Sequence, residues 1–158
     1  MSILDMIKTT LQAAGVQFKL LHHEPTPTSA DAARVRGSSL TDGGKALVLK
    51  VGDWFGVFVL SAALKLDSKK IQDHFKVKKI RFATKEELLE LTGLVPGSVP
   101  PFGEPVLPLP LYLDTSITKN EHINFNAGSL TDSVDMLVKD YLALAKPKEM
   151  FGFSASSS

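Results

Sequence analysis

Residues 43–60, GGKALVLKVGDWFGVFVL, are the stretch of the chain from which the fold can be worked outward. Residues 45–51 and 54–60 are two apolar runs rich in Val, Leu and Phe, and Gly52-Asp53 separates them. Two such runs joined by a pair of turn residues predict a β-hairpin. Because the apolar residues are nearly continuous, we expect these strands to be buried on both faces.

Helical and strand-like segments alternate on either side of this hairpin. Periodicity and capping patterns predict helices over residues 3–14, 28–36, 67–75, 84–93 and 134–145, the fourth with a capping box of Thr84 and Glu87. Strand signals occur at residues 16–20, 79–83, 106–113 and 123–126, with a weaker signal at 129–133. Pro108 and Pro110 predict that segment 106–113 is an edge or bulged strand. Hairpins mixed with helices predict an α+β domain with a mixed sheet.

The size of the chain predicts one domain. Its 158 residues suit a single hydrophobic core, which we place at residues 1–147. The serine-rich end predicts that residues 148–158 form a flexible tail or a linker. No apolar run reaches membrane-spanning length, and the N-terminus lacks the features of a signal peptide, so we expect a cytoplasmic protein that does not enter membranes.

Composition excludes several kinds of site. The chain has no cysteine, which excludes disulfides, thiolate metal sites and a cysteine nucleophile. No HExxH metal pattern, serine nucleophile elbow, P-loop or dinucleotide-binding glycine pattern occurs. His22 and His23 are adjacent, so on a strand they would point to opposite faces and would not share a metal. We expect no metal and no cofactor.

The charge of the chain is weak but unevenly placed. A net charge of +1 predicts that any nucleic acid partner is held over a small part of its length, or with help from another protein. Eight basic residues nevertheless fall in one stretch: Lys65, Lys69, Lys70, Lys76, Lys78, Lys79, Arg81 and Lys85. This stretch is either a solvated face or a surface that contacts phosphates.

Three segments could carry chemistry. Lys45 opens a buried strand directly after Gly43-Gly44, where its ammonium could project into a cleft or could equally reach out to solvent. The segment 93–103, GLVPGSVPPFG, is a long proline- and glycine-rich loop. It is either a structural crossover or a rigid loop that aims backbone N–H groups at an ester carbonyl.

The third segment is 124–129, NFNAGS, where Asn126 and Ser129 offer hydrogen bonds and a glycine lets a ligand approach the backbone. The alternative is an ordinary transition from strand to turn. His122 precedes this segment and could be a base or a positioning group, although a surface or structural role is equally compatible with the sequence.

Taken together, these segments resemble the YbaK family of aminoacyl-tRNA deacylases, which includes prolyl-tRNA synthetase editing domains. Residues 42–49, DGGKALVL, resemble its lysine-bearing strand, and residues 93–103 resemble its GxxPGxxxPfG loop. Residues 125–129, FNAGS, resemble its late Asn-Ala-Gly segment, and residues 23–26, HEPT, its early loop. The resemblance implies a mixed, strongly curved, barrel-like sheet flanked by helices.

The resemblance also implies roles for individual residues. Lys45 would engage the phosphate or ribose of the terminal adenosine, and Gly97 and Ser98 would position the aminoacyl ester through backbone groups. Gly128 would form the wall of the amino-acid pocket. The remaining substrate-binding candidates in the matching segments are Pro96, Gly103, Asn126 and Ser129. His122, a few residues before the late segment, is a further candidate.

An activity follows from the resemblance. It implies metal-independent hydrolysis of a mischarged aminoacyl-tRNA, and the Pro-Gly-Ser loop favours Ala-tRNA(Pro). Clearing of Cys- or Ser/Thr-tRNA and a non-catalytic module that binds tRNA or a synthetase are the alternatives. The partners would be the aminoacylated acceptor end of tRNA and a prolyl-tRNA synthetase, in cis or in trans.

Overall fold

The computed structural model describes residues 2–25 and 40–156. The helix predicted at 28–36 lies outside these residues. The helices are α1 (Ile3–Ala13), α3 (Ser68–Phe75), α4 (Lys85–Thr92), α5 (Val138–Ala145) and the 3-10 helix η1 (Thr115–Lys119). The strands are β1 (Phe18–His22), β2 (Gly44–Val51), β3 (Trp54–Ser61), β4 (Leu64–Leu66), β5 (Ile80–Phe82), β6 (Leu111–Asp114), β7 (His122–Asn126), β8 (Asp132–Leu137), β9 (Glu149–Phe151) and β10 (Ser154–Ser156).

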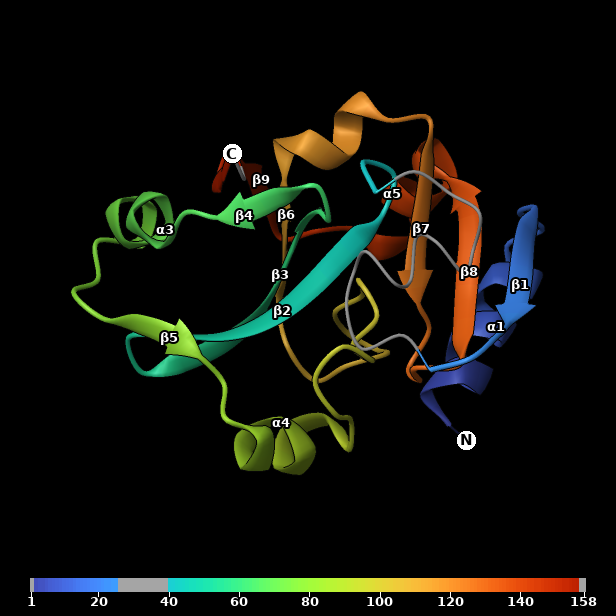
Figure 1. Cartoon of the computed structure of the whole chain (residues 1–158), viewed down its shortest axis with the longest axis horizontal. Coiled ribbons are helices and arrows are strands. Elements are labelled where there is room, and N and C mark those ends of the chain that lie inside the picture. Colours follow the sequence, from blue (N-terminus) through green and yellow to red (C-terminus); the bar gives the residue numbers. More distant parts are fainter. Residues whose placement is uncertain (1, 26–39, 157–158) are drawn as a thin grey trace.

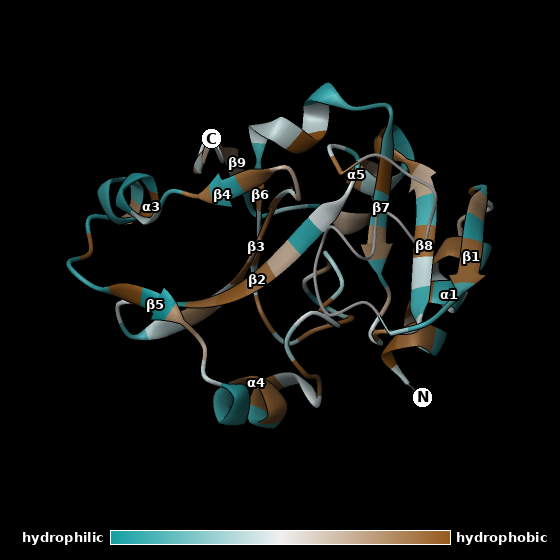
Figure 2. Ribbon diagram, in the orientation of Figure 1, coloured by the Kyte–Doolittle hydropathy of each residue, from teal (hydrophilic) through white to brown (hydrophobic). Residues whose placement is uncertain are grey.

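The predicted hairpin is confirmed and forms the centre of a five-stranded mixed sheet. β2 and β3 pair antiparallel from Gly44↔Ser61 to Val51↔Trp54. The strand order is β5-β2-β3-β6-β9, and β6 runs parallel to both β3 and β9. Hydrophobic residues dominate both hairpin strands, and the sheet occupies the side of the molecule opposite β1, β7 and β8 (Figures 1 and 2).

Alternate residues of the hairpin enter two separate hydrophobic cores. One core contains buried residues from β2 and β3 together with α1, α5, β7 and β8: Val48, Val57, Val59, Ile7, Leu11, Tyr141, Phe125 and Val134. The other is largely aromatic and contains Phe58, Tyr112 and Phe153, with the rings of Trp54, Phe75 and Phe151 against them. Burial of the hairpin on both faces is therefore confirmed.

A second, three-stranded sheet lies beside the first. β8 pairs antiparallel with β1 and β7 in the order β1-β8-β7. The two sheets meet at one isolated bridge between Gly43 and Asn124. At this junction a side chain on Gly44 would collide with Ile123, which explains the glycine there.

The α+β class is confirmed, but the barrel-like description is wrong. The β-strands of the described chain form separate sheets that are neither closed nor strongly curled, and β10 pairs with β4 in a third, two-stranded sheet. A single bridge is too little backbone pairing to continue one sheet into the next. The mixed character that the resemblance implied is present within the five-stranded sheet.

The prediction of a flexible tail from residue 148 is wrong for residues 149–156. β9 pairs with β6, and β10 pairs with β4. Between them, the Phe153 side chain is completely buried in the aromatic core. The serines at the end of the chain concealed this aromatic anchor, which offsets the entropy of ordering the segment.

Two other expectations also need correction. β6 begins at Leu111 and lies between two strands, so it is central and not an edge strand. Pro108 and Pro110 are tolerated because both precede the paired residues. The helix predicted from residue 134 begins at Val138, because residues 132–137 pair with both β1 and β7, which outweighs their helical pattern.

Asp114 joins the end of the chain to the sheet. Its buried carboxylate accepts hydrogen bonds from Phe153 N at 2.6 Å, Ser154 Oγ at 2.7 Å and Ser116 N at 3.0 Å. Burial by itself opposes ionisation of Asp114, but these donors outweigh it and lower its pKa.

We expect Asp114→Asn to destabilise the protein by about 1–3 kcal/mol, because an amide replaces one acceptor oxygen by a donor group among buried donors. Urea unfolding at neutral pH measures the change. Asp73→Asn, which removes only an exposed pair with Lys69, is the control and should cost about 0.5 kcal/mol or less.

The stabilisation that Asp114 provides should also depend on pH. Because the folded-state pKa of Asp114 is lowered, its contribution is present above the unfolded pKa and is lost as pH falls through the folded pKa. The stability difference between the wild type and Asp114→Asn should therefore shrink in acid. A difference that grows on acidification would contradict this account.

Candidate active site

The loop predicted to carry chemistry starts from a well-defined helix end. α4 begins with the predicted capping box of Thr84 and Glu87 and ends at Gly93, whose φ is 76°. Hydrogen bonds from Arg81 and Thr84 lower the pKa of Glu87 to about 2. Both ends of α4 are thereby fixed, which defines where the chain enters the loop.

A tight turn at residues 95–98 forms the exposed tip of the loop. Ser98 N donates to Val95 O at 3.1 Å, and the sequence places Pro96 second and Gly97 third in the turn. Gly97 has a φ of 89°. Proline followed by a residue with positive φ is the pattern of a type II turn, and this explains the glycine.

The Ser98 hydroxyl is used within this turn. It donates to Val95 O at 2.7 Å and accepts from Val95 N at 3.2 Å, and the side chain is buried. Ser98 therefore shapes the turn, and its role in positioning the ester stays a prediction.

The turn is fastened to the three-stranded sheet by its carbonyl groups. Asn126 Nδ2 donates to Gly97 O at 2.6 Å, and Gly128 N donates to Ser98 O at 3.0 Å. Gly97 itself remains exposed. Among the described residues, no acceptor is recorded for the Gly97 amide N–H.

A line of polar side chains continues from Asn126 away from the turn. Ser133 Oγ donates to Asn126 Oδ1 at 3.2 Å, and the pairing of these residues in β7 and β8 places the two side chains together. His23 Nε2 lies 2.6 Å from Ser133 Oγ, and His23 Nδ1 lies 2.7 Å from Glu24 O. Residues from three strand ends thus converge behind the turn.

Ser129 belongs to a neighbouring network in the β7–β8 connection. Its hydroxyl donates to Asp132 Oδ2 at 2.9 Å and contacts Thr131 Oγ1 at 2.8 Å. His22 Nδ1 lies 2.9 Å from Asp132 Oδ1. Burial opposes ionisation of Asp132, and the bonds from His22 and Ser129 outweigh it and lower the Asp132 pKa. This network holds the connection between β7 and β8.

Gly128 is a close-packing glycine. Its φ is 84°, and a Cβ there would lie 2.8 Å from Ile3 Cγ2. The first turn of α1 therefore packs directly against the residue whose amide holds Ser98. This contact is what the structure records at Gly128, and its assignment to an amino-acid pocket stays a prediction.

Lys45 lies on β2, half-buried and away from these contacts. Its Nζ donates to Leu64 O at 2.6 Å, and burial lowers the pKa of its ammonium group. An ammonium has three donors, so this bond leaves N–H groups for a ligand. No contact between Lys45 and residues 95–98 is recorded in the described chain.

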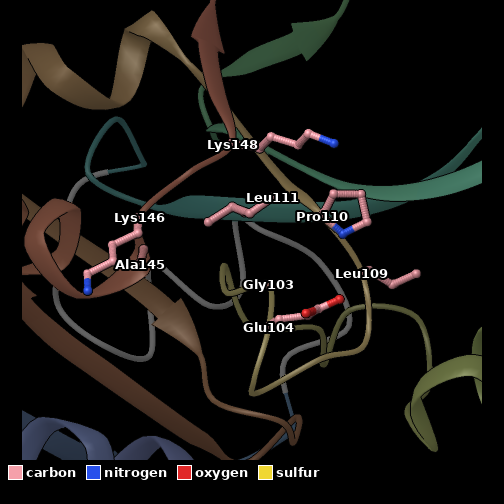
Figure 3. Close-up of a pocket in the computed structure, with 8 residues that line it drawn as sticks. All are labelled: Gly103, Glu104, Leu109, Pro110, Leu111, Ala145, Lys146 and Lys148. Atoms are coloured by element: carbon pink, nitrogen blue, oxygen red, sulfur yellow. The ribbon is translucent and has the colours of Figure 1, made fainter.

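His122 and Gly103 lie elsewhere. His122 begins β7, whereas Asn126 ends it, and its Nδ1 lies 3.0 Å from Asp135 Oδ1 beside a groove of about 580 Å³. Gly103 lines a cavity of about 270 Å³ with Glu104, Lys146 and Lys148 (Figure 3). Neither residue is brought to the Gly97 turn, and their substrate-binding roles stay predictions.

Part of the basic stretch surrounds a groove of about 410 Å³. Its lining includes four basic residues but no acidic one: Lys50, Lys78, Lys79 and Arg81. Lys78 and Lys79 are exposed, whereas Arg81 pairs with Glu87 at 2.7 Å. Cations around a groove are a typical binding surface for phosphates.

The part of the chain that the structure describes contains no group of three or more His, Cys, Asp or Glu side chains that could hold a metal ion. Within the same residues, no helix is long and apolar enough to span a membrane.

The structure therefore brings together five of the predicted site residues: Pro96, Gly97, Ser98, Asn126 and Gly128. It adds Ser133 and His23, which the sequence did not single out for this site. The signal that could have found Ser133 is its register opposite Asn126, but that register follows only when residues 132–137 are recognised as a strand.

Comparison with known proteins identifies the family of this chain. The model of the aminoacyl-tRNA editing domain matches residues 23–144. The chain is 34% identical over 146 residues to the multifunctional Ser/Thr-tRNA deacylase ProXp-y of Escherichia coli strain K12, covering 87% of this chain and 85% of that protein. It is 35% identical over 130 residues to a proline–tRNA ligase of Shouchella clausii strain KSM-K16, covering 79% of this chain but 23% of the ligase.

Solved structures agree with the fold. The crystal structure of a candidate trans-editing enzyme for prolyl tRNA synthetase superposes with a TM-score of 0.82 at 26% identity, covering 98% of both chains. Fold and site thus define the class, an aminoacyl-tRNA editing deacylase. The chain belongs to the aminoacyl-tRNA editing domain family.

We expect Gly97→Ala to lower the kcat/KM of deacylation by about 100-fold, because a side chain at φ 89° displaces the turn and would approach Leu130 Cδ2. Gly93→Ala is the matched control, since Gly93 also has positive φ but has open space beside it. Each change should reduce stability, measured by thermal unfolding, but only Gly97→Ala should impair turnover. Equal losses of turnover would contradict a role for the turn.

Proposed function

We propose that this chain clears mischarged tRNA by hydrolysing the ester between serine or threonine and the 3′-terminal ribose. The observation that carries the proposal is the exposed Gly97 turn, which Asn126 and Gly128 hold by its two carbonyl groups. A donor held rigidly in this way costs no reorganisation when charge develops on the ester oxygen.

The reaction is an ordinary hydrolysis. Water adds to the ester carbonyl carbon, the bond from that carbon to the ribose oxygen breaks, and a proton goes to the ribose oxygen. The products are a free amino acid and a tRNA with a free terminal hydroxyl. Because the aminoacyl ester is already activated, positioning and a fixed N–H donor supply the catalysis without a metal.

Ser and Thr are favoured by two observations. Asn126 lies beside the turn, and its side-chain amide has a second N–H besides the one given to Gly97 O; such a polar group is what a site needs to recognise a substrate hydroxyl. The Escherichia coli relative at 34% identity is a Ser/Thr-tRNA deacylase by name. Ala-tRNA(Pro) and Cys-tRNA stay the competing substrates, and only turnover separates the three.

The tRNA would be held in two places. In this proposal the Lys45 ammonium contacts the phosphate or ribose of the terminal adenosine, with the N–H groups that Leu64 O leaves free. Lys78 and Lys79, exposed beside the basic groove, contact phosphates farther along the acceptor stem. Few phosphate contacts agree with the net charge of +1. A prolyl-tRNA synthetase, in cis or in trans, would raise the local concentration of tRNA.

A panel of Ser-, Thr-, Ala- and Cys-tRNA tests the activity directly. We expect hydrolysis of the Ser and Thr esters, unchanged by EDTA, and a loss of about 100-fold or more in kcat/KM for Lys45→Ala. Lys139→Ala, an exposed lysine on α5, is the control. Preference for Ala-tRNA(Pro) would replace the proposed substrate. Binding without turnover of any ester would identify a non-catalytic tRNA-binding module.

Salt dependence tests the basic groove. We expect Lys78→Gln/Lys79→Gln to weaken tRNA binding and to reduce the slope of log Kd against log salt by about 1–2, because up to two phosphate contacts are removed. Lys119→Gln/Lys139→Gln removes the same charge elsewhere and should leave the slope nearly unchanged. Equal slopes for both pairs would assign the effect to net charge alone.

A further inference from the structure

His23 is connected to the Gly97 turn by three consecutive hydrogen bonds, and a fourth joins it to Glu24 O. The line runs from Glu24 O to His23, then to the Ser133 hydroxyl, the Asn126 amide and finally Gly97 O. Ser133, in the middle of the line, is completely buried. Both ends of the line are backbone carbonyl oxygens, which can only accept.

These two ends dictate the direction of every bond between them. Because Gly97 O accepts, Asn126 directs its Nδ2 to the turn and its Oδ1 to Ser133. The single hydroxyl proton of Ser133 then serves Asn126 Oδ1, so Ser133 Oγ must accept from His23 Nε2. Because His23 Nδ1 also donates to Glu24 O, the complete line needs an N–H on both ring nitrogens of His23. Asn126 keeps its orientation only while His23 presents an N–H at Nε2.

The alternative arrangement breaks the line at the turn. If Nε2 lacks a proton, it takes the Ser133 hydroxyl proton, and Asn126 Oδ1 loses its donor. Reversal of the Asn126 amide would restore a bond to Ser133 but would set an amide oxygen 2.6 Å from Gly97 O, where two acceptors repel. Loss of the proton at His23 Nε2 therefore destabilises the Asn126 side chain, which holds Gly97 O.

We propose that His23 is a positioning residue for deacylation, acting through Ser133 and Asn126 on the Gly97 turn. It does not touch the ester in this account. Its N–H at Nε2 orients the Ser133 hydroxyl, and this hydroxyl orients the side-chain amide of Asn126. The Asn126 amide holds Gly97 O, and the backbone N–H of Gly97 faces the ester in this proposal. This inference rests on the proposed function and adds residues outside the catalytic turn.

Two substitutions at His23 separate this role from simple packing. The amide nitrogen of Gln can reach the position of His23 Nε2, whereas the shorter Asn reaches only the position of Nδ1. We expect His23→Asn to lower kcat by about 10- to 100-fold with little change in KM, and His23→Gln to restore most of the loss. His22→Gln is the control, since this neighbour is exposed and bonds to Asp132.

Ser133→Ala supplies the second half of the test. If both residues act along one line, His23→Asn/Ser133→Ala should be no slower than the slower single variant. Multiplied losses, or equal activities for His23→Asn and His23→Gln, would overturn the proposal.

Amide hydrogen exchange provides a readout that does not depend on turnover. Gly128 N donates to the turn at Ser98 O, so exchange of this amide should accelerate in His23→Asn and return towards wild type in His23→Gln. If the wild type hydrolyses no ester, the proposed function is wrong, and the exchange rate of the Gly128 amide still tests whether His23 acts on the Gly97 turn. If His23→Asn shows normal turnover and normal exchange, the positioning role of His23 is wrong, while the proposed deacylase function is unaffected.

Discussion

Burial of the β2–β3 hairpin on both faces is the constraint on which the rest of the structure depends. Two strands with apolar residues at nearly every position need a layer on each side. On one side α1, α5 and the three-stranded sheet supply it, and on the other α3, β4 and residues 151–153 do. Phe153 completes the second layer, and Asp114 holds the backbone around it.

The site combines a loop with one end of the three-stranded sheet. The Gly97 turn follows α4, but its carbonyl groups are held by Asn126 at the end of β7 and by Gly128 just after it. Gly128 in turn packs against Ile3 at the start of α1. A short exposed turn thus inherits its rigidity from three elements that are far apart in the sequence.

The sequence predicted local features well and long-range pairing poorly. The hairpin and the capping box of Thr84 and Glu87 depend on neighbouring residues, and both were located correctly. The helix expected from residue 134 and the flexible tail failed because partners distant in sequence decided their structure. For the same reason the sequence identified Asn126 but missed Ser133, which only the β7–β8 register brings to it.

The parallel pairing of β3 with β6 has a consequence for the order of folding. β2 and β3 can meet through a turn of two residues, whereas β6 reaches β3 only after α3, β5 and α4 have been traversed. Closing such a long segment costs entropy before any contact compensates for it, so we expect the β2–β3 hairpin to form before β6 pairs with β3. The Gly97 turn lies inside that segment. A nascent chain would therefore possess its central strands well before it possessed an active site.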